Sequence, residues 1–232
     1  MVDILNMFGQ ASGLYINISK CVVFPIRCEG YNLEDVMMGF QCPIKDFPCN
    51  YLGLPLHTRQ LRRLDIQPVI DKVANRLSTW KGSFINRAGR LMLVNSVLSS
   101  MPVYFLTVFD LKKWALKKID KIRRGFLWNG TSQAKGNQCL VAWDTCKKPK
   151  ANGGLGVLDL DKFSRALCLR WLWFSWVDPD RPWVGSPVLC SKVDKQLFRS
   201  CTTVTVGDGR TAVFWDSTWV NGNAPRDLAP NL

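Results

Sequence analysis

Apolar residues recur every three or four positions through the middle third of the chain, which is the period of an amphipathic helix. Residues 65–80 carry one such stripe, and Pro68 suits the first position of a helix. A second stripe follows Asn86, which can cap a helix, and stops where Pro102 disrupts the pattern. A third stripe covers residues 111–128. We predict three helices joined by short links, an arrangement that packs as a compact bundle.

The first sixty residues follow a different pattern. The alternation of Leu14, Ile16 and Ile18 predicts a strand, and residues 22–24 predict a second short strand. Residues 34–40 predict a helical turn. This part of the chain is therefore expected to mix short strands with helix.

The last third combines an apolar helix with a hairpin signal. Residues 163–177 form an aromatic-rich apolar run with two arginines, which predicts a helix. Residues 203–206 and 211–215 flank the turn sequence Gly-Asp-Gly-Arg at 207–210, which predicts a β-hairpin. The predicted fold class is α+β.

Basic charge is concentrated in one segment. The chain has a formal net charge of +13, and residues 61–150 hold 18 basic and five acidic residues, which accounts for the whole excess. A basic protein favours an anionic partner, either nucleic acid or an anionic membrane surface. Because the excess is concentrated and not scattered, it indicates a face that binds a polyanion.

The helix predicted at 111–128 has two faces. Its inward stripe is apolar and consists of Leu111, Ala115, Ile119, Ile122 and Phe126. Its outward stripe is cationic and consists of Lys113, Lys117, Lys121 and Arg124. Such a stripe can be a solvated surface, but the concentration of charge favours contact with backbone phosphates, which carries no sequence readout. Trp114 interrupts the cationic side and either stacks on a base or packs against a neighbouring helix.

Residues that could hold a metal or a nucleotide are sparse. Three cysteine pairs have six residues between their members, whereas zinc ligands in a knuckle are usually about two to four residues apart. Without a sign of secretion, we expect reduced, free thiols. His57 is the single histidine. The glycines of residues 153–156 lack the spacing of a phosphate cradle. We predict no zinc and no cofactor.

Neither a secretory signal nor a membrane span is expected. The first twenty residues lack a basic start and a sustained apolar run. The apolar stretches at 97–109 and 166–177 are shorter than the roughly 20 residues that cross a bilayer. We expect an intracellular protein of the nucleus or cytoplasm.

Five motifs, spread over residues 12–130, resemble one family. They are Ser-Gly-Leu-Tyr-Ile-Asn-Ile-Ser-Lys (12–20), Tyr-Leu-Gly-Leu-Pro-Leu (51–56), Trp-Lys-Gly-Ser-Phe-Ile-Asn-Arg-Ala-Gly-Arg (80–90), Ser-Val-Leu-Ser-Ser-Met-Pro-Val-Tyr (96–104) and Gly-Phe-Leu-Trp-Asn-Gly (125–130). Together they resemble the reverse transcriptases of plant non-LTR (LINE-type) retrotransposons. With the Val-Ala-Trp-Asp and Gly-Gly-Leu-Gly segments that follow, the resemblance covers nearly the whole chain.

The resemblance implies a division into three parts. Residues 1–60 would be the end of the palm, 61–130 a helical thumb, and 131–232 a linker and an incomplete aromatic region that leads into the family's zinc-binding region. Within the palm end, Lys20 matches a lysine placed near the leaving pyrophosphate. Tyr51, Leu52 and Gly53 match the primer grip. A plain surface lysine and a buried tight turn are the alternatives.

The chain departs from the family at the catalytic step. Polymerases hold two metal ions with paired carboxylates, and this sequence contains no Asp-Asp pair. The intact enzyme would need Mg²⁺, but we expect this chain alone to be inactive and to bind RNA and DNA, in particular an RNA–DNA hybrid. Its missing palm and fingers would be a further partner. A non-functional pseudogene product and a basic amphipathic protein of the membrane surface stay open as alternatives.

Overall fold

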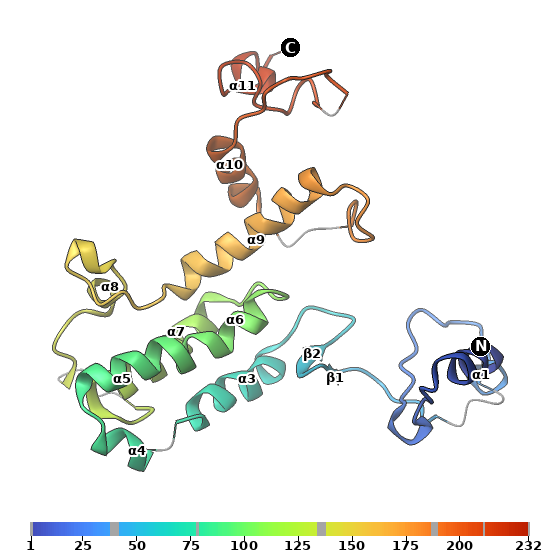
Figure 1. Ribbon diagram of the computed structural model, residues 1–232, viewed down its shortest axis with the longest axis horizontal. Coiled ribbons are helices and arrows are strands. Elements are labelled where there is room, and N and C mark those ends of the chain that lie inside the picture. Colours follow the sequence, from blue (N-terminus) through green and yellow to red (C-terminus); the bar gives the residue numbers. More distant parts are fainter. Residues whose placement is uncertain are drawn as a thin grey trace. The chain divides into compact units, whose positions relative to one another are not determined.

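The computed structural model describes residues 2–37, 42–77, 79–133, 138–186, 190–210 and 212–231. Helices dominate, and one two-stranded antiparallel sheet accompanies them, so the predicted α+β class is confirmed (Figure 1). The chain separates into two compact units, Met1–Pro68 (unit 1) and Val69–Leu232 (unit 2). The three-part division at residues 60 and 130 stays a prediction.

Unit 1 is built from short elements. These are α1 (Val2–Ser12), η1 (Ile18–Lys20), α2 (Leu33–Val36), β1 (Cys49–Tyr51) and β2 (Leu54–Leu56). β1 and β2 pair antiparallel with Tyr51 opposite Leu54, so Leu52 and Gly53 form a two-residue turn. Both turn residues have positive φ, 51° and 79°, as a type I′ hairpin requires. Because Leu52 has a Cβ, this conformation costs about 1 kcal/mol.

The strands predicted in unit 1 are mostly absent. Residues 14–17 have no strand conformation, and Ile18 begins the 3₁₀ turn η1, which Asn17 caps by accepting the Ser19 N–H at 3.1 Å. Val23 forms only an isolated parallel bridge with Ile44. The two predicted strands of this region are therefore wrong. An alternating pattern is not sufficient, because a strand persists only where another strand pairs with it. The helical turn is confirmed as α2, and residues 38–40 lie outside the described residues.

Apolar side chains lie largely exposed in unit 1. Tyr15, Tyr31 and Met7 are among the most exposed, and Leu54 is one of the few buried apolar residues of this unit. Burial of apolar area is the main favourable term in folding. The described part of unit 1 is therefore held mainly by local hydrogen bonds and turns.

Unit 2 contains the hydrophobic core. After α3 (Arg63–Asn75), which runs across the boundary of the units, the elements are α4 (Thr79–Phe84), α5 (Arg87–Leu93), η2 (Val94–Leu98), α6 (Ser100–Leu106), α7 (Lys113–Asn129), α8 (Trp143–Cys146), η4 (Lys150–Asn152), α9 (Leu160–Val177), α10 (Lys192–Cys201) and α11 (Pro225–Leu228). α7 packs against α4, α5, η2 and α9 (Figure 1). Val73, Val94, Leu98, Ala115 and Ile119 are almost completely buried.

The first predicted helix begins earlier and ends earlier than expected. Asp65 accepts the Arg62 N–H at 2.8 Å, which fixes the helix start, so α3 begins at Arg63 and Pro68 lies inside it. The apolar stripe of residues 65–80 is divided between α3, which ends at Asn75, and α4. The period of apolar residues alone does not predict the break between α3 and α4.

The second predicted helix is longer than expected. Asn86 caps α5 as predicted, accepting the Gly89 N–H at 2.8 Å. Pro102 does not end the helix, because it is the third residue of α6, where a helix N–H has no partner in any case. The π-helical turn η2 precedes α6, and the Ser99 N–H donates to the Val94 carbonyl, five residues earlier, at 2.9 Å.

The predicted C-terminal hairpin does not form. Residues 202–210 and 212–219 contain no strand, and Thr211 lies outside the described residues. The chain instead turns at Val213, whose carbonyl accepts the Ser217 N–H at 2.9 Å, while the Phe214 ring packs on Trp215 and Trp219. Aromatic packing of a local turn has replaced cross-strand pairing.

Two glycines allow α4 to approach the end of α7. A Cβ on Gly82 would overlap the carbonyl oxygen of Gly130, which ends α7 in the left-handed conformation. We expect Gly82→Ala to lower the free energy of unfolding by about 1–3 kcal/mol, measured by urea unfolding. Gly207→Ala is the matched control, because a Cβ there meets no atom within 4 Å. Equal stability of the two variants would contradict this close packing.

Candidate nucleic-acid interface

The two predicted faces of α7 are present. All five residues of the apolar stripe are buried, and Ala115 and Ile119 are completely so. Helix formation here follows from the 3.6-residue period and from Gly130, whose φ of 74° ends the helix. The apolar face therefore fixes the rotation of α7 and directs the opposite side outward.

The predicted cationic residues share the outward side. Lys113, Lys117 and Lys121 are exposed, and none forms an ion pair with another described residue. Arg124 is half-buried at the edge of this group, and its Nε has no hydrogen-bond acceptor among the described residues. We call these four residues the α7 cationic face. It presents four positive side chains along one helix.

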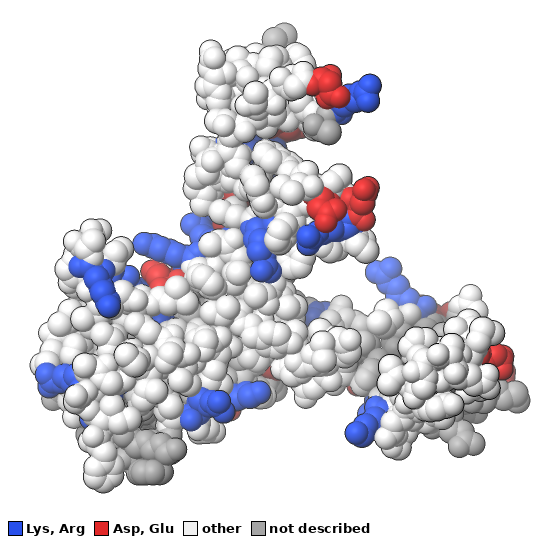
Figure 2. Space-filling model, in the orientation of Figure 1, with Lys and Arg blue, Asp and Glu red and all other residues white. Residues whose placement is uncertain are grey.

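The charge of this face opposes the stability of its own helix. The first turn of α7 holds no acidic residue, no side chain caps it, and Lys112 and Lys113 lie where the helix dipole is already positive. A cation at this end costs about 0.3–1 kcal/mol. Figure 2 shows lysine and arginine side chains scattered over a mostly uncharged surface on the face that it draws.

The burial of Trp114 is intermediate between a fully exposed ring that stacks on a base and a ring packed against a neighbouring helix. It is half-buried, and the Lys118 Nζ lies 5.4 Å from its ring centroid. Lys118, which was not among the predicted site residues, is an exposed lysine beside the α7 cationic face. The cation–π pair fixes an aromatic ring next to that face.

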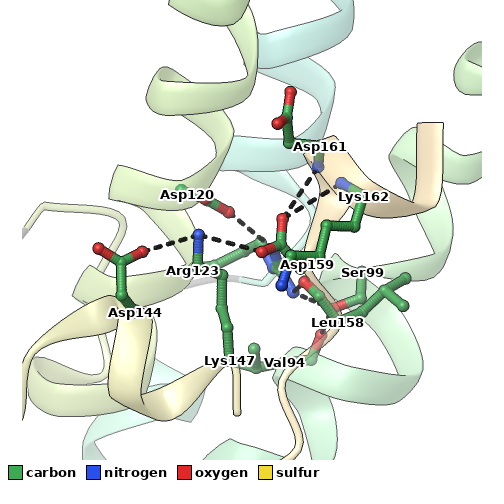
Figure 3. Close-up of polar contacts among 10 residues, drawn as sticks. All are labelled: Val94, Ser99, Asp120, Arg123, Asp144, Lys147, Leu158, Asp159, Asp161 and Lys162. Atoms are coloured by element: carbon green, nitrogen blue, oxygen red, sulfur yellow. Dashed lines mark hydrogen bonds and ion pairs between the residues drawn. The ribbon is translucent and has the colours of Figure 1, made fainter. Parts of the chain in front are cut away.

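Arg123 is the main residue that the sequence analysis missed. It is completely buried, and its guanidinium donates to Asp120 Oδ1 at 2.7 Å, Ser99 Oγ at 2.7 Å and the Leu158 carbonyl at 2.8 Å (Figure 3). Burial lowers the pKa of Arg123, and the Asp120 carboxylate opposes that shift. Arg123 therefore joins α7 to Ser99, directly after η2, and to the segment that enters α9.

A second polar contact fixes the start of α9. Asp159 caps α9 by accepting the N–H groups of Asp161 and Lys162, and its other oxygen lies 3.5 Å from the Lys147 Nζ (Figure 3). Lys147 also pairs with Asp144 at 2.9 Å. Burial lowers the pKa of Lys147, but Asp144 and Asp159 raise it more, so the net shift is upward. Lys147 is therefore part of the scaffold and not of the α7 cationic face.

Arg90 is likewise structural. Its Nε donates to the carbonyls of Gly82 and Ile85, each at 2.9 Å, and its Nη1 donates to the Trp128 carbonyl at 3.1 Å. Part of the basic excess of residues 61–150 is thus used inside the fold. The charge available for a ligand is smaller than the sequence count suggests.

Carboxylates limit the α7 cationic face at its N-terminal end. A cavity of about 330 Å³ there is lined by Lys112 and Lys113 and also by Asp110, Asp161 and Asp194. Burial, followed by the two neighbouring carboxylates, raises the pKa of Asp110. This mixed lining does not favour phosphate, so the stretch from Lys117 to Arg124 is the better anion-binding part.

The other predicted site residues belong to unit 1. Lys20 ends η1 and is exposed. Tyr51, Leu52 and Gly53 form the exposed tip of the β1–β2 hairpin, so the alternative of a buried tight turn is wrong. Their roles near pyrophosphate and primer stay predictions.

The described residues offer neither a metal-binding cluster nor a membrane-spanning helix. No group of three or more histidine, cysteine, aspartate or glutamate side chains there could hold a metal ion, so these residues do not fit the Mg²⁺ site of an intact polymerase. No described helix is long and apolar enough to cross a bilayer.

The buried thiol Cys168 is expected to resist alkylation. Burial, with Cys190 nearby, raises the pKa of Cys168 to about 11. At pH 8 we expect iodoacetamide to modify the exposed Cys201 well before Cys168, as read by mass spectrometry. The raised pKa also predicts that stability falls between about pH 9 and 11, because the thiol ionises first in the unfolded chain. Equal modification rates at pH 8 would contradict this burial.

The chain is similar to plant proteins. No family model matches it. An Arabidopsis thaliana protein named "Putative ribonuclease H protein At1g65750" is 28% identical over 200 residues, which cover 75% of this chain and 32% of that protein. Another A. thaliana protein, "Uncharacterized mitochondrial protein AtMg00310", is 36% identical over 72 residues, which cover 31% of this chain and 46% of that protein. The chain thus spans less than half the length of each of these two relatives.

Proposed function

We propose that the chain is a nucleic-acid-binding part of a plant retroelement reverse transcriptase and that the α7 cationic face binds backbone phosphates of an RNA–DNA hybrid. The observation that carries this proposal is the set of three exposed lysines, which form no ion pair with another described residue, and Arg124 on a helix whose opposite face is buried. Contacts of this kind supply affinity and salt dependence without reading sequence.

The similarities support the same class of partner. The family motifs of residues 12–130 resemble plant LINE-type reverse transcriptases, and one plant relative is named as a ribonuclease H protein. Reverse transcription and ribonuclease H action both use an RNA–DNA hybrid. Since this chain covers only 32% of that relative, we carry over the class of ligand and not the hydrolytic activity.

The buried apolar face of α7 disfavours the membrane alternative. A helix that lies on a bilayer inserts its apolar face among the lipids. The apolar face of α7 is instead occupied by the core, where Phe126 keeps only 2% exposure. At a membrane, α7 could therefore offer only its cationic side and no apolar face for insertion. Binding to backbone phosphates requires only the cations.

Within this proposal, the chain contributes binding and not chemistry. It has no paired aspartates for the two metal ions of a polymerase. The rigid core behind α7, tied by Arg123, holds the cations in one row. We propose that a separate part of the enzyme supplies the catalytic carboxylates.

A salt series tests the proposal. Fluorescence anisotropy of a labelled RNA–DNA hybrid, titrated with the purified chain, gives the binding constant at each salt concentration. We expect log K to fall linearly with log salt, with a slope near −0.7 to −0.9 for each phosphate contact, or about −3 for four contacts. Absence of binding, or a binding constant independent of salt, would overturn the proposal.

A further inference from the structure

Two cysteines of unit 1 each lie two residues before a residue of the same backbone bridge. Val23 and Ile44 form a parallel bridge, which hydrogen bonds of 3.0 and 2.9 Å close. In a parallel pair, the residues two positions earlier on both segments lie on the same side and face each other. Those residues are Cys21 and Cys42.

The two thiols also converge on one turn. The Cys21 Sγ donates to the Asn17 carbonyl at 3.4 Å, and the Cys42 Sγ lies 3.9 Å from the Ile18 carbonyl, its acceptor. Both cysteines are half-buried. Desolvation, followed by the charge and hydrogen bond of Cys21, raises the pKa of Cys42, which agrees with adjacent thiols.

We propose that Cys21 and Cys42 form a reversible dithiol–disulfide site that a two-electron thiol oxidant, such as a diazene, converts into a covalent link. Residues paired across strands have Cα atoms about 5 Å apart, and disulfides accept Cα separations of about 4.4–6.8 Å. Because Cys21 and Cys42 lie only two residues from the paired Val23 and Ile44, we expect them to come within this range. A thiolate adds to the diazene nitrogen, and the second thiolate displaces the hydrazine from sulfur. One S–S bond replaces two S–H bonds, and two electrons and two protons pass to the N=N group.

The link would change the behaviour of the loop that it closes. This loop contains α2 and Arg27, an exposed residue with φ of 52°. Within the described residues of unit 1, strand-type pairing occurs in two places, the β1–β2 ladder and the Val23–Ile44 bridge. A covalent link there is expected to slow tryptic cleavage after Arg27, because cleavage requires local opening.

Cys168 and Cys190 are the competing pair. The Cys190 Sγ donates to the Cys168 carbonyl at 3.0 Å, so its thiol is directed to backbone oxygen. Its partner Cys168 is buried and has a pKa of about 11, which leaves little thiolate to attack an oxidant. The two pairs are therefore expected to oxidise at different rates.

Disulfide mapping tests the proposal and does not depend on nucleic-acid binding. The reduced full chain is treated with diamide, blocked with iodoacetamide, digested without reductant and examined by mass spectrometry. We expect the peptides of Cys21 and Cys42 to be joined first, with loss of two hydrogen atoms. Dithiothreitol should reverse the link, and tryptic cleavage after Arg27 should be slower in the linked chain.

Two variants and one solvent control make the test specific. Cys42→Ser should abolish the linked peptide, whereas Cys49→Ser, at another half-buried cysteine of unit 1, should retain it. In urea the preference for this pair should disappear. Random pairing in native buffer, alkylation of both thiols after diamide, or the same preference in urea would overturn the proposal.

Discussion

Replacing Arg123 by alanine is expected to lower the free energy of unfolding by about 3 kcal/mol. The substitution removes a buried guanidinium that donates to Asp120, Ser99 and the Leu158 carbonyl. It leaves these acceptors without their donor and opens a cavity at a completely buried position. The loss falls at the lower end for a buried ion pair, because the Asp120 side chain keeps 21% exposure and regains water.

Urea unfolding followed by circular dichroism measures this effect. Lys121→Ala on the same helix is the matched control, because the Lys121 side chain is exposed, and we expect it to change stability by less than about 0.5 kcal/mol. If Arg123→Ala unfolds at the same urea concentration as the wild type, the buried network does not hold α7 to the entry of α9.

Changing Lys113, Lys117, Lys121 and Arg124 together to glutamine is expected to weaken binding to an RNA–DNA hybrid by on the order of 10²- to 10³-fold near 0.1 M salt. Each lost phosphate contact removes about 0.7–0.9 from the slope of log K against log salt, so the slope should become about three units shallower. Glutamine is polar and uncharged, and the three lysines are exposed, so the fold should persist.

A variant of equal charge change separates specific contact from net charge. Lys162, Lys192, Lys195 and Arg210 are exposed basic residues outside α7. Their replacement by glutamine lowers the net charge of the chain as much as the α7 variant does. We expect its salt slope to remain near that of the wild type, and an equal loss in both variants would show that only overall charge matters.

Long periodic segments were the most predictable part of the fold. The rotation of α7 followed from its sequence because many apolar positions at one period agree on a single buried face. The cap at Asn86 was also predictable, since it depends on neighbours within three residues. Short strands were not, because residues 14–18 and 203–215 need a pairing partner that local sequence does not report.

The candidate site was predictable in its exposed residues and not in its support. A cation opposite an apolar stripe is expected to face solvent, which located the lysines of α7. Arg123 was missed because arginine is rarely buried. A signal was present, however: it lies four residues after Ile119 and three before Phe126, on the apolar stripe itself, and Asp120 precedes it by three. A charged residue on a buried stripe with a nearby counter-ion indicates a core ion pair.

Lysine footprinting tests most directly whether the α7 cationic face contacts phosphate. The chain is acetylated with a small reagent in the presence and absence of an RNA–DNA hybrid at low salt, and each lysine is quantified by mass spectrometry. We predict protection of Lys113, Lys117 and Lys121 by the hybrid, with Lys162, Lys192 and Lys195 modified equally in both conditions. Protection spread evenly over both groups, or confined to the second, would contradict a specific nucleic-acid interface on α7.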